Sequence, residues 1–327
     1  MVLTSIKLKN FRIHSNIKLE FSGNLNYIVG NNGQGKTSVL ESIYYLCTTK
    51  SFCAKSDGEV VKFGNNNFEI DGYFSDLTRD KVRVIYDINE SKKYYYLNEK
   101  QENKSSEIIG KFPVVLLTPA DHAITQGIPG ERRKFVDSVI SQGSNTYLKN
   151  LLDYNRTLRH RSSLLSKMKE SRNSSMTNEL DSWTNRLVES GTGLIEHRIS
   201  FIKNFIRYIS ESYSKIMNDE ERPKIEYYFL DGYKQENIKD QFAEILWVKR
   251  EEEMRRATNL VGPHRDDFIF YINDKNLSAS RAHKISDYLK EVGQTFVTLT
   301  DFGNFKFLKK DNDDKLIKLG NGVLSYA

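Results

Sequence analysis

The chain has 327 residues, enough for one large domain with an insertion or for two domains, each able to bury a substantial core. Hydrophobic residues make up 38% and aromatic residues 12%, so the composition excludes disorder as the default state. Lys and Arg outnumber Asp and Glu by 49 to 43, a mild excess that is compatible with an anionic partner such as nucleic acid.

Two further features narrow the class of protein. Cys47 and Cys53 cannot form a zinc site alone, and no His lies near them at ligand spacing, so we interpret them as reduced intracellular residues. The first residues lack the apolar core of a signal peptide, and no stretch approaches the roughly 18 apolar residues of a membrane span. We therefore expect a cytoplasmic protein without a membrane partner.

The first part of the chain predicts a sheet with hairpins. Alternating apolar and polar residues indicate strands at Thr4–Leu8 and Ile17–Phe21. A short buried strand at Asn26–Val29 leads into a Gly-rich loop, and Thr37–Leu46 then carries apolar residues at helical spacing. Further strands, separated by Asn, Asp and Gly, are predicted at Phe68–Phe74, Val82–Tyr86, Tyr94–Leu97 and Val114–Leu117.

From about Glu131 the pattern changes to long charged helices with one apolar face. A polar break at 171–175 separates them from a second helix at about Glu179–Ile216, and the two are expected to pack as an antiparallel arm. Mixed structure follows, with strands near Lys224–Phe229, Phe268–Ile272 and Thr295–Leu299 and a helix near Gln241–Arg256. The pattern predicts an α/β fold with a discontinuous head at 1–130 and 222–327 and a helical arm at 131–221.

The strongest chemical signal is a complete G-x-x-x-x-G-K-T phosphate-loop motif between a predicted strand and a predicted helix. Glycines let successive backbone N–H groups face phosphate oxygens, and the helix N-terminus favours anions. Lys36 should contact the β- and γ-phosphates, and the Thr37 hydroxyl is placed to bind Mg²⁺. The expected cofactor-binding residues are Gly30, Asn31, Asn32, Gly33, Gln34, Gly35, Lys36 and Thr37.

The alternative reading is a Gly-rich turn that matches by chance, which the flanking strand and helix argue against. The motif alone does not decide between ATP and GTP, or between a kinase, a motor and a switch.

Several segments beyond the phosphate loop carry a family resemblance. Asn10-Phe11-Arg12 precedes the loop, and Ser51-Phe52 and 117–121 follow it. The segments 127–137, with Arg132-Arg133-Lys134, and 260–267, with Gly262-Pro263-His264-Arg265, complete the series. In this order they resemble blocks of the bacterial RecF family, relatives of the structural-maintenance-of-chromosomes ATPases, from Leu3 to Asp301.

The resemblance implies a P-loop NTPase of the ATP-binding-cassette type, with an inserted helical lobe, that binds ATP and Mg²⁺ and dimerises around ATP. It also implies binding to single-stranded and duplex DNA or gap junctions in replication, recombinational repair and the SOS response. RecR and RecO are the partners that it implies. The family is a weak DNA-dependent ATPase.

Two departures from the family pattern bear on activity. Cys53 stands where an Arg is expected after Ser-Phe. Ser278-Ala279-Ser280 passes straight into Arg281, where the family would place a signature loop, its helix and an apolar strand ending in paired acids. The sequence therefore reads as an internal deletion that removes the Walker B acids, which hold Mg²⁺ and polarise water. We expect hydrolysis to be severely impaired, ATP-driven dimerisation to be impaired for the same reason, and the core to lose a helix and a strand.

Basic residues provide candidates for contact with DNA. They lie after the predicted sheet and along the arm: Arg132, Arg133, Lys134, Arg156, Arg159, Arg161 and Lys167. For any single residue of this set, the simpler interpretation is a charge on a solvated helix face. Attraction to phosphates accumulates over several charges, however, so we favour contact between DNA and the set as a whole.

Three other features each allow a functional and a structural interpretation. His264 and Arg265 could sense nucleotide or could form a polar turn. Asp266 and Asp267 precede an alternating strand, so we read them as a turn at its start rather than as replacement Walker B acids. The run Tyr94-Tyr95-Tyr96 could stack on bases, but alternation in a hairpin would bury one ring, and core packing is preferred.

Three hypotheses follow. The first is a RecF-like ATP-binding DNA repair protein, and the second is a remnant of that family that binds ATP and DNA without hydrolysis. The third, a small-molecule P-loop kinase, leaves the arm unexplained. Steady-state ATP turnover, its dependence on DNA and its loss on changing Lys36 separate the first two.

Overall fold

The computed structural model describes residues 1–122, 124, 127–171, 176–217, 222–230, 236–272, 275–276, 293–300, 313–320 and 323–326. The chain forms two compact units, Met1–Leu116 with Arg281–Ala327, and Leu117–Ser280. We call them the head unit and the helical unit. The segment 277–292, where the sequence predicts the deletion, and the polar break at 172–175 lie outside the described residues.

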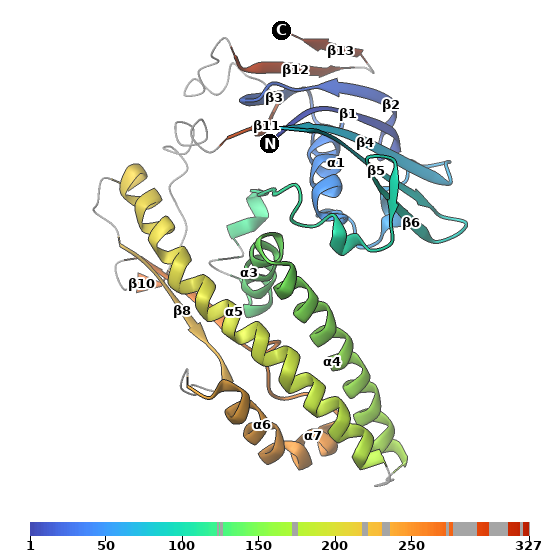
Figure 1. Ribbon diagram of the computed structural model, residues 1–327. Coiled ribbons are helices and arrows are strands. Elements are labelled where there is room, and N and C mark those ends of the chain that lie inside the picture. Colours follow the sequence, from blue (N-terminus) through green and yellow to red (C-terminus); the bar gives the residue numbers. More distant parts are fainter. Residues whose placement is uncertain are drawn as a thin grey trace. The chain divides into compact units, whose positions relative to one another are not determined.

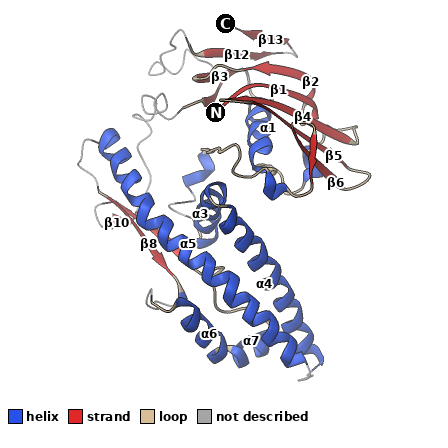
Figure 2. Cartoon of the chain, viewed as in Figure 1, coloured by secondary structure: helices blue, strands red, loops and turns tan. Residues whose placement is uncertain are grey.

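The head unit contains an antiparallel sheet of six strands in the order β2-β1-β4-β5-β6-β7 (Figures 1 and 2). Its strands are β1 (Val2–Phe11), β2 (His14–Glu20), β4 (Asn67–Ser75), β5 (Arg79–Asp87), β6 (Lys92–Leu97) and β7 (Lys100–Glu102). In β1, Leu3 and Ile6 are both buried although an odd spacing separates them, because the register with β4 shifts between Leu3 and Ser5. The irregularity lets both side chains reach the same core.

A second sheet of the head unit carries the phosphate loop. Its order is β11-β3-β12-β13, formed by β3 (Leu25–Val29), β11 (Thr295–Leu299), β12 (Lys315–Gly320) and β13 (Val323–Tyr326). Both β11 and β12 pair with β3 in parallel, and β13 is antiparallel to β12. Helix α1 (Lys36–Thr48) follows β3 and buries Val39, Ile43 and Leu46 in a core shared with both sheets.

The helical unit contains α3 (Pro129–Gly143), α4 (Asn145–Ser171), α5 (Thr177–Met217), α6 (Ile238–Val248) and α7 (Arg250–Arg256). Helices α4 and α5 run antiparallel, as predicted (Figure 1). An early residue of α4 contacts a late residue of α5, and a later residue of α4 contacts an earlier one. Tyr147 meets Arg198, and Arg161 meets Thr184. A three-stranded sheet, β10-β9-β8, completes the unit, with β8 (Pro223–Tyr228), β9 (Asp267–Ile272) and β10 (Lys275–Asn276). Among the described residues, short 3-10 helices lie in loops of the head unit, at Asp57–Val60 and Ser105–Glu107, and of the helical unit, at Pro119–His122.

The compact units divide the chain at different points from the predicted head and arm. Residues 222–280 fall in the helical unit, because β8 packs on α5 and the buried Phe242 and Phe268 share a core with Tyr154 of α4. The predicted strand at Val114–Leu117 is wrong. This segment carries no regular structure, and Val115 and Leu117 are 86% and 72% exposed. None of the helices in the described residues is long and apolar enough to cross a membrane.

Candidate nucleotide site and the basic residues of the helical unit

The predicted phosphate loop lies between the end of β3 and the start of α1, at the carboxyl edge of three parallel strands. Ligands bind at this edge in open parallel sheets, because strands deliver loops there and helix N-termini face it. Helix α1 has no acidic residue in its first turn, so no carboxylate offsets its positive end. The eight predicted residues are therefore brought together in a setting that suits an anion.

The loop is attached to both strands that flank β3. The Gly30 N–H donates to the Leu299 carbonyl of β11 at 3.3 Å. A Cβ atom at Gly30 would lie 2.4 Å from the Leu319 carbonyl oxygen of β12, a distance that excludes any larger residue without a backbone shift. Gly30 is thus required by close packing against the sheet.

The last turn of the loop rests on the beginning of β2. Gly35 has a φ of 84°, and a Cβ there would lie 2.6 Å from His14 Nε2. His14 Nε2 donates to the Gly35 carbonyl at 3.2 Å, so the ring carries its proton on this nitrogen. Burial lowers the pKa of His14 and nearby Lys62 lowers it further, against a raising effect of the Gly35 carbonyl. Sequence reasoning missed His14, whose only signal is its position two residues after the Asn-Phe-Arg block.

Side chains of the loop bond to the loop itself. Lys36 Nζ donates to the carbonyls of Gly30 at 2.6 Å and Asn31 at 2.9 Å, and Gln34 Oε1 accepts from the Asn31 N–H at 2.8 Å. The ammonium group therefore already lies across the loop, where the phosphates of a nucleotide would compete for it. Thr37 is exposed beside it.

A metal ion at this site would depend on few protein groups. Among the described residues, no three His, Cys, Asp or Glu side chains gather as a metal site. Mg²⁺ keeps several waters and binds through few protein oxygens plus substrate phosphates, so Thr37 and the phosphates fit its needs.

The Asn-Phe-Arg and Ser-Phe blocks meet at Glu41 of α1, the helix that follows the loop. Arg12 forms a bidentate pair with Glu41 of α1, at 2.8 and 2.6 Å, and the Ser51 hydroxyl donates to the same carboxylate. Ser51 Oγ accepts the backbone N–H groups of Cys53 and Ala54. These contacts hold the segment that carries Cys53 against α1, and Cys53 itself is exposed.

The structure separates the seven DNA candidates by burial. Arg156, Arg159 and Lys167 are exposed on α4, and Lys134 is 75% exposed beside Glu131. Arg132 is 13% exposed and pairs through two hydrogen bonds with Asp267, while Arg133 donates to the Asp266 carbonyl. These last two arginines hold α3 against the start of β9.

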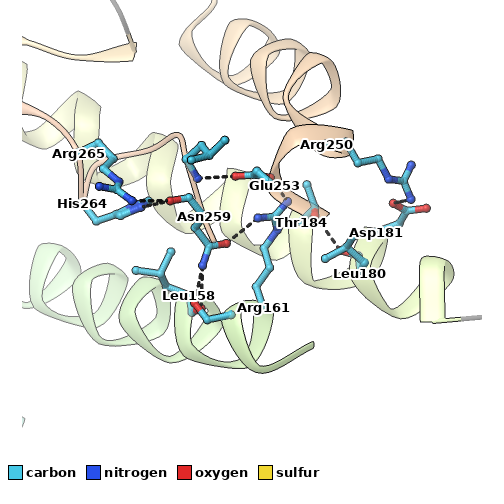
Figure 3. A network of polar contacts seen from close by, with 12 residues as sticks. Leu158, Arg161, Leu180, Asp181, Thr184, Arg250, Glu253, Asn259, His264 and Arg265 are labelled. Atoms are coloured by element: carbon cyan, nitrogen blue, oxygen red, sulfur yellow. Dashed lines mark hydrogen bonds and ion pairs between the residues drawn. The ribbon is translucent and has the colours of Figure 1, made fainter. Parts of the chain in front are cut away.

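Arg161 corrects the prediction of an exposed cation. It is 1% exposed, and its guanidinium donates to Glu253 at 2.6 Å, Asn259 at 2.6 Å and Thr184 at 3.0 Å (Figure 3). Helical position alone could not reveal this burial, because its partners come from α5, from α7 and from the loop after α7. Arg161 therefore joins elements of the helical unit instead of facing a ligand.

A second buried arginine was missed by the sequence analysis. Arg198, 2% exposed on α5, pairs with Asp137 at 2.8 Å and Asp266 at 3.2 Å. It also donates to the Pro263 carbonyl. Asp266 is thus an internal partner and Asp267 begins β9, which confirms the interpretation of this acidic pair as a turn before a strand.

His264 also makes its contacts inside the helical unit. Its Nδ1 accepts from the Tyr154 hydroxyl at 2.7 Å, and its Nε2 donates to the Asn259 carbonyl at 3.3 Å. Arg265 donates to the same carbonyl at 3.1 Å (Figure 3). Burial, with a smaller contribution from nearby arginines, lowers the pKa of His264 to about 4. These contacts fit the interpretation of His264 and Arg265 as part of a polar turn.

Burial in the run Tyr94-Tyr95-Tyr96 follows the alternation of side chains predicted for a strand. Tyr95 is 5% exposed in the head core, while Tyr94 and Tyr96 on either side are only partly buried. Core packing is confirmed for the central ring.

Comparisons with known proteins agree with these observations. A family model described as an AAA domain matches residues 5–316. The DNA replication and repair protein RecF of Chloroherpeton thalassium is 37% identical over 85% of this chain and 76% of its own length. RecF of Salinibacter ruber is 32% identical over 98% of this chain and 77% of its own.

A solved structure gives the same result. It is that of the recombination mediator protein RecF with ATP in the RecFOR pathway, with a TM-score of 0.87 at 26% identity over 100% of this chain and 97% of that one. A second structure, of RecF with an ATP analogue, has a TM-score of 0.84. With the P-loop NTPase fold, the chain belongs to the RecF family of DNA replication and repair proteins.

Proposed function

We propose that this protein binds ATP with Mg²⁺ at the loop 30–37 and engages DNA in replication, recombinational repair and the SOS response. The observation that carries the proposal is the loop itself. It joins β3 to α1 at the carboxyl edge of parallel strands, and Lys36 donates hydrogen bonds to the Gly30 and Asn31 carbonyls at its start. Family membership and a related structure described with ATP support ATP as the nucleotide.

Each loop residue has a proposed task. The backbone N–H groups of 31–36 and the first turn of α1 bind phosphate oxygens, and Lys36 moves from the Gly30 and Asn31 carbonyls to the terminal phosphates. Thr37 binds Mg²⁺, which offsets phosphate charge when it is present. Exposed Arg156, Arg159, Lys167 and Lys134 bind DNA phosphates, with no role there for buried Arg161.

The proposed partners are single-stranded and duplex DNA, RecR and RecO, and a second copy of the chain bound in the presence of ATP. The name of a related structure, which places RecF in the RecFOR pathway, supports the protein partners. The proposed location is the cytoplasm, where these partners act.

A second candidate function is ATP and DNA binding without hydrolysis. The strands of the phosphate-loop sheet support it. In the described part of that sheet, β11 ends at Leu299 and β12 at Gly320. Neither strand ends in the pair of acidic residues that a Walker B strand would carry. A water for attack on the γ-phosphate would then lack the carboxylates that hold Mg²⁺ and orient the nucleophile.

The experiment is a titration of fluorescent duplex DNA with purified protein, with and without Mg-ATP, at two salt concentrations. We expect ATP to tighten DNA binding. Lys36→Ala should weaken ATP binding by about 10- to 100-fold, because charge-assisted hydrogen bonds contribute roughly 1.5–3 kcal/mol, and should remove the gain in DNA affinity.

The matched control is Lys50→Ala, which removes an exposed lysine just past the other end of α1. It should leave the ATP effect intact. If DNA binding is indifferent to ATP, or Lys36→Ala keeps the full gain, the proposal fails. Steady-state phosphate release in the same samples separates the two candidates: turnover that needs DNA and Lys36 supports the ATPase, and ATP binding without turnover supports the second candidate.

A further inference from the structure

A groove of about 510 Å³ lies in the helical unit between α5 and β8, which run beside each other in Figure 1. It is distant in sequence from the nucleotide loop and contains none of the DNA candidates. The residues that line it are Ile199, Ile202, Lys203, Ile225, Glu226, Tyr227 and Tyr228.

The strand side of the groove is an edge. Four consecutive residues, Ile225–Tyr228, line the cavity, although successive side chains of a strand point to opposite faces. A cavity along the border of the strand would meet all four. In the described residues β8 is the outermost strand of the sheet β10-β9-β8, so this border carries backbone N–H and C=O groups that no strand of the sheet uses.

The helix side is apolar with one cation. Ile199, Ile202 and Lys203 are spaced so that they share one face of α5. The two isoleucines are partly buried against the core, and Lys203 is exposed. Lys203 forms no ion pair with any residue that the structure describes, whereas Glu226 across the groove is paired with Lys224 at 2.7 Å.

The beginning of β8 carries the features that natural edge strands use against unwanted pairing. Pro223 cannot donate a hydrogen bond, and Lys224 places a charge at the edge. Neither residue lines the groove. These two features therefore end where the groove begins. About 13 Å of strand, Ile225–Tyr228, has no partner on this edge among the strands that the structure describes.

We propose that this groove binds an extended segment of a partner protein, which adds as a strand to the edge of β8. Aliphatic side chains on one face of the segment pack on Ile199 and Ile202, and an acidic side chain on the same face pairs with Lys203. Backbone hydrogen bonds supply affinity in this mode, and the pockets for alternate side chains supply selectivity. The inference is independent of the proposed function, since it uses no residue of the nucleotide site.

The test uses a fluorescein-labelled peptide of about eight residues, long enough to span β8, in which valine and threonine alternate and one central valine is replaced by glutamate. The glutamate then lies on the same face of the peptide as the remaining valines. Binding to the full chain is measured by fluorescence anisotropy. Lys203→Glu should weaken binding about fivefold, and a peptide with lysine in place of its glutamate should regain that factor on the variant. Lys215→Glu makes the same charge change on the same helix away from the groove and should leave the affinity unchanged.

Backbone pairing is tested with two N-methylated peptides, each methylated at one set of alternate residues. One set should abolish binding and the other should preserve it, because only one edge of the peptide faces β8. The proposal is overturned if no peptide binds, if Lys203→Glu has no effect, or if both methylated peptides bind equally. It is also overturned if sedimentation shows that a second copy of the chain fills the groove, as a dimer that Lys203→Glu dissociates.

Discussion

At the scale of single residues, burial divides the arginines of the helical unit into two groups. Arg161 and Arg198 lie in the interior, at 1% and 2% exposure. Arg161 pairs with one carboxylate, that of Glu253, and Arg198 pairs with two, those of Asp137 and Asp266. Arg156 and Arg159, on the same helix as Arg161, are exposed. An arginine on a helix can therefore either hold elements of the interior together or remain exposed to bind a ligand. Which of the two it does depends on whether another element supplies a buried carboxylate for it.

His264 gives a prediction about pH at this scale. Its pKa of about 4 lies below the ordinary 6.5, because burial disfavours the charged ring. Above pH 6.5 the ring is neutral in both folded and unfolded chains. As the pH falls towards 4 the unfolded chain takes up the proton first, so stability is lost, by about 1–2 kcal/mol at pH 5.

The measurement is urea unfolding at pH 7 and pH 5, followed by tryptophan fluorescence. Both tryptophans, Trp183 in α5 and Trp247 in α6, report on the helical unit. His264→Asn keeps an acceptor for the Tyr154 hydroxyl but does not titrate. It should lose less stability than the wild type between the two pH values, and equal losses in both proteins would refute the assignment.

At the scale of elements, the pair of Arg161 and Glu253 joins α4 to α7. Both side chains are essentially buried, at 1% and 0% exposure, and their closest atoms are 2.6 Å apart. Arg161→Met leaves the Glu253 carboxylate without its cation in the interior. We expect a loss of about 3–5 kcal/mol in the free energy of unfolding, measured by the same fluorescence signal.

The double variant Arg161→Met, Glu253→Leu provides the internal control. Replacing both charges with apolar groups removes the uncompensated carboxylate, so the double variant should be more stable than Arg161→Met alone. Additive losses from the two single changes would show that the pair does not couple the helices.

Elements with a strong local pattern were predictable. The strand at 26–29 and the helix at 37–46 were found within two residues of β3 and α1, and the long helices of the arm were placed correctly. These segments combine apolar periodicity with clear breaks. The predicted helix at Gln241–Arg256 proved to be two helices, α6 and α7, which meet at Lys249. No Gly or Pro marks that break in the sequence.

Other elements depend on contacts that the sequence does not display. Residues 114–117 form a short apolar run like that of a buried strand, yet Val115 and Leu117 find no partner strand among the described residues and stay exposed. Conversely β12, with the weak pattern Lys315–Gly320, is a strand because it pairs with β3. Within the site, the eight residues of the phosphate loop were predictable from spacing, but the support from His14 and Leu319 arises from chain segments far away in sequence.

At the scale of the whole molecule, each compact unit has its own hydrophobic core. The core of the head unit joins both of its sheets to α1, and the core of the helical unit joins α3, α4, α5 and α6 to β8 and β9. The nucleotide loop belongs to the first unit and the exposed arginines of α4 to the second. The residues proposed for ATP binding and for DNA binding therefore belong to different units, and each set can be substituted without changing a residue of the other.

The net charge of +6 makes salt dependence the natural test of the DNA proposal. The logarithm of the DNA association constant should fall linearly with the logarithm of salt concentration, with a slope of about −0.9 for each phosphate neutralised on duplex DNA. Changing Arg156 and Arg159 together to Ala removes two exposed cations, so the slope should become shallower by about two if both contact phosphate.

Lys100→Ala with Lys104→Ala removes the same charge from exposed positions of the head unit. If net charge alone attracts DNA, this control will flatten the slope as much as the arginine pair does. If the surface of α4 binds the phosphates, only the arginine variant will change the slope, because counterions are released from phosphates that are directly contacted and distant charges are screened beyond about 8–10 Å. A slope unchanged in both variants would place DNA on other residues and remove α4 from the proposed interface.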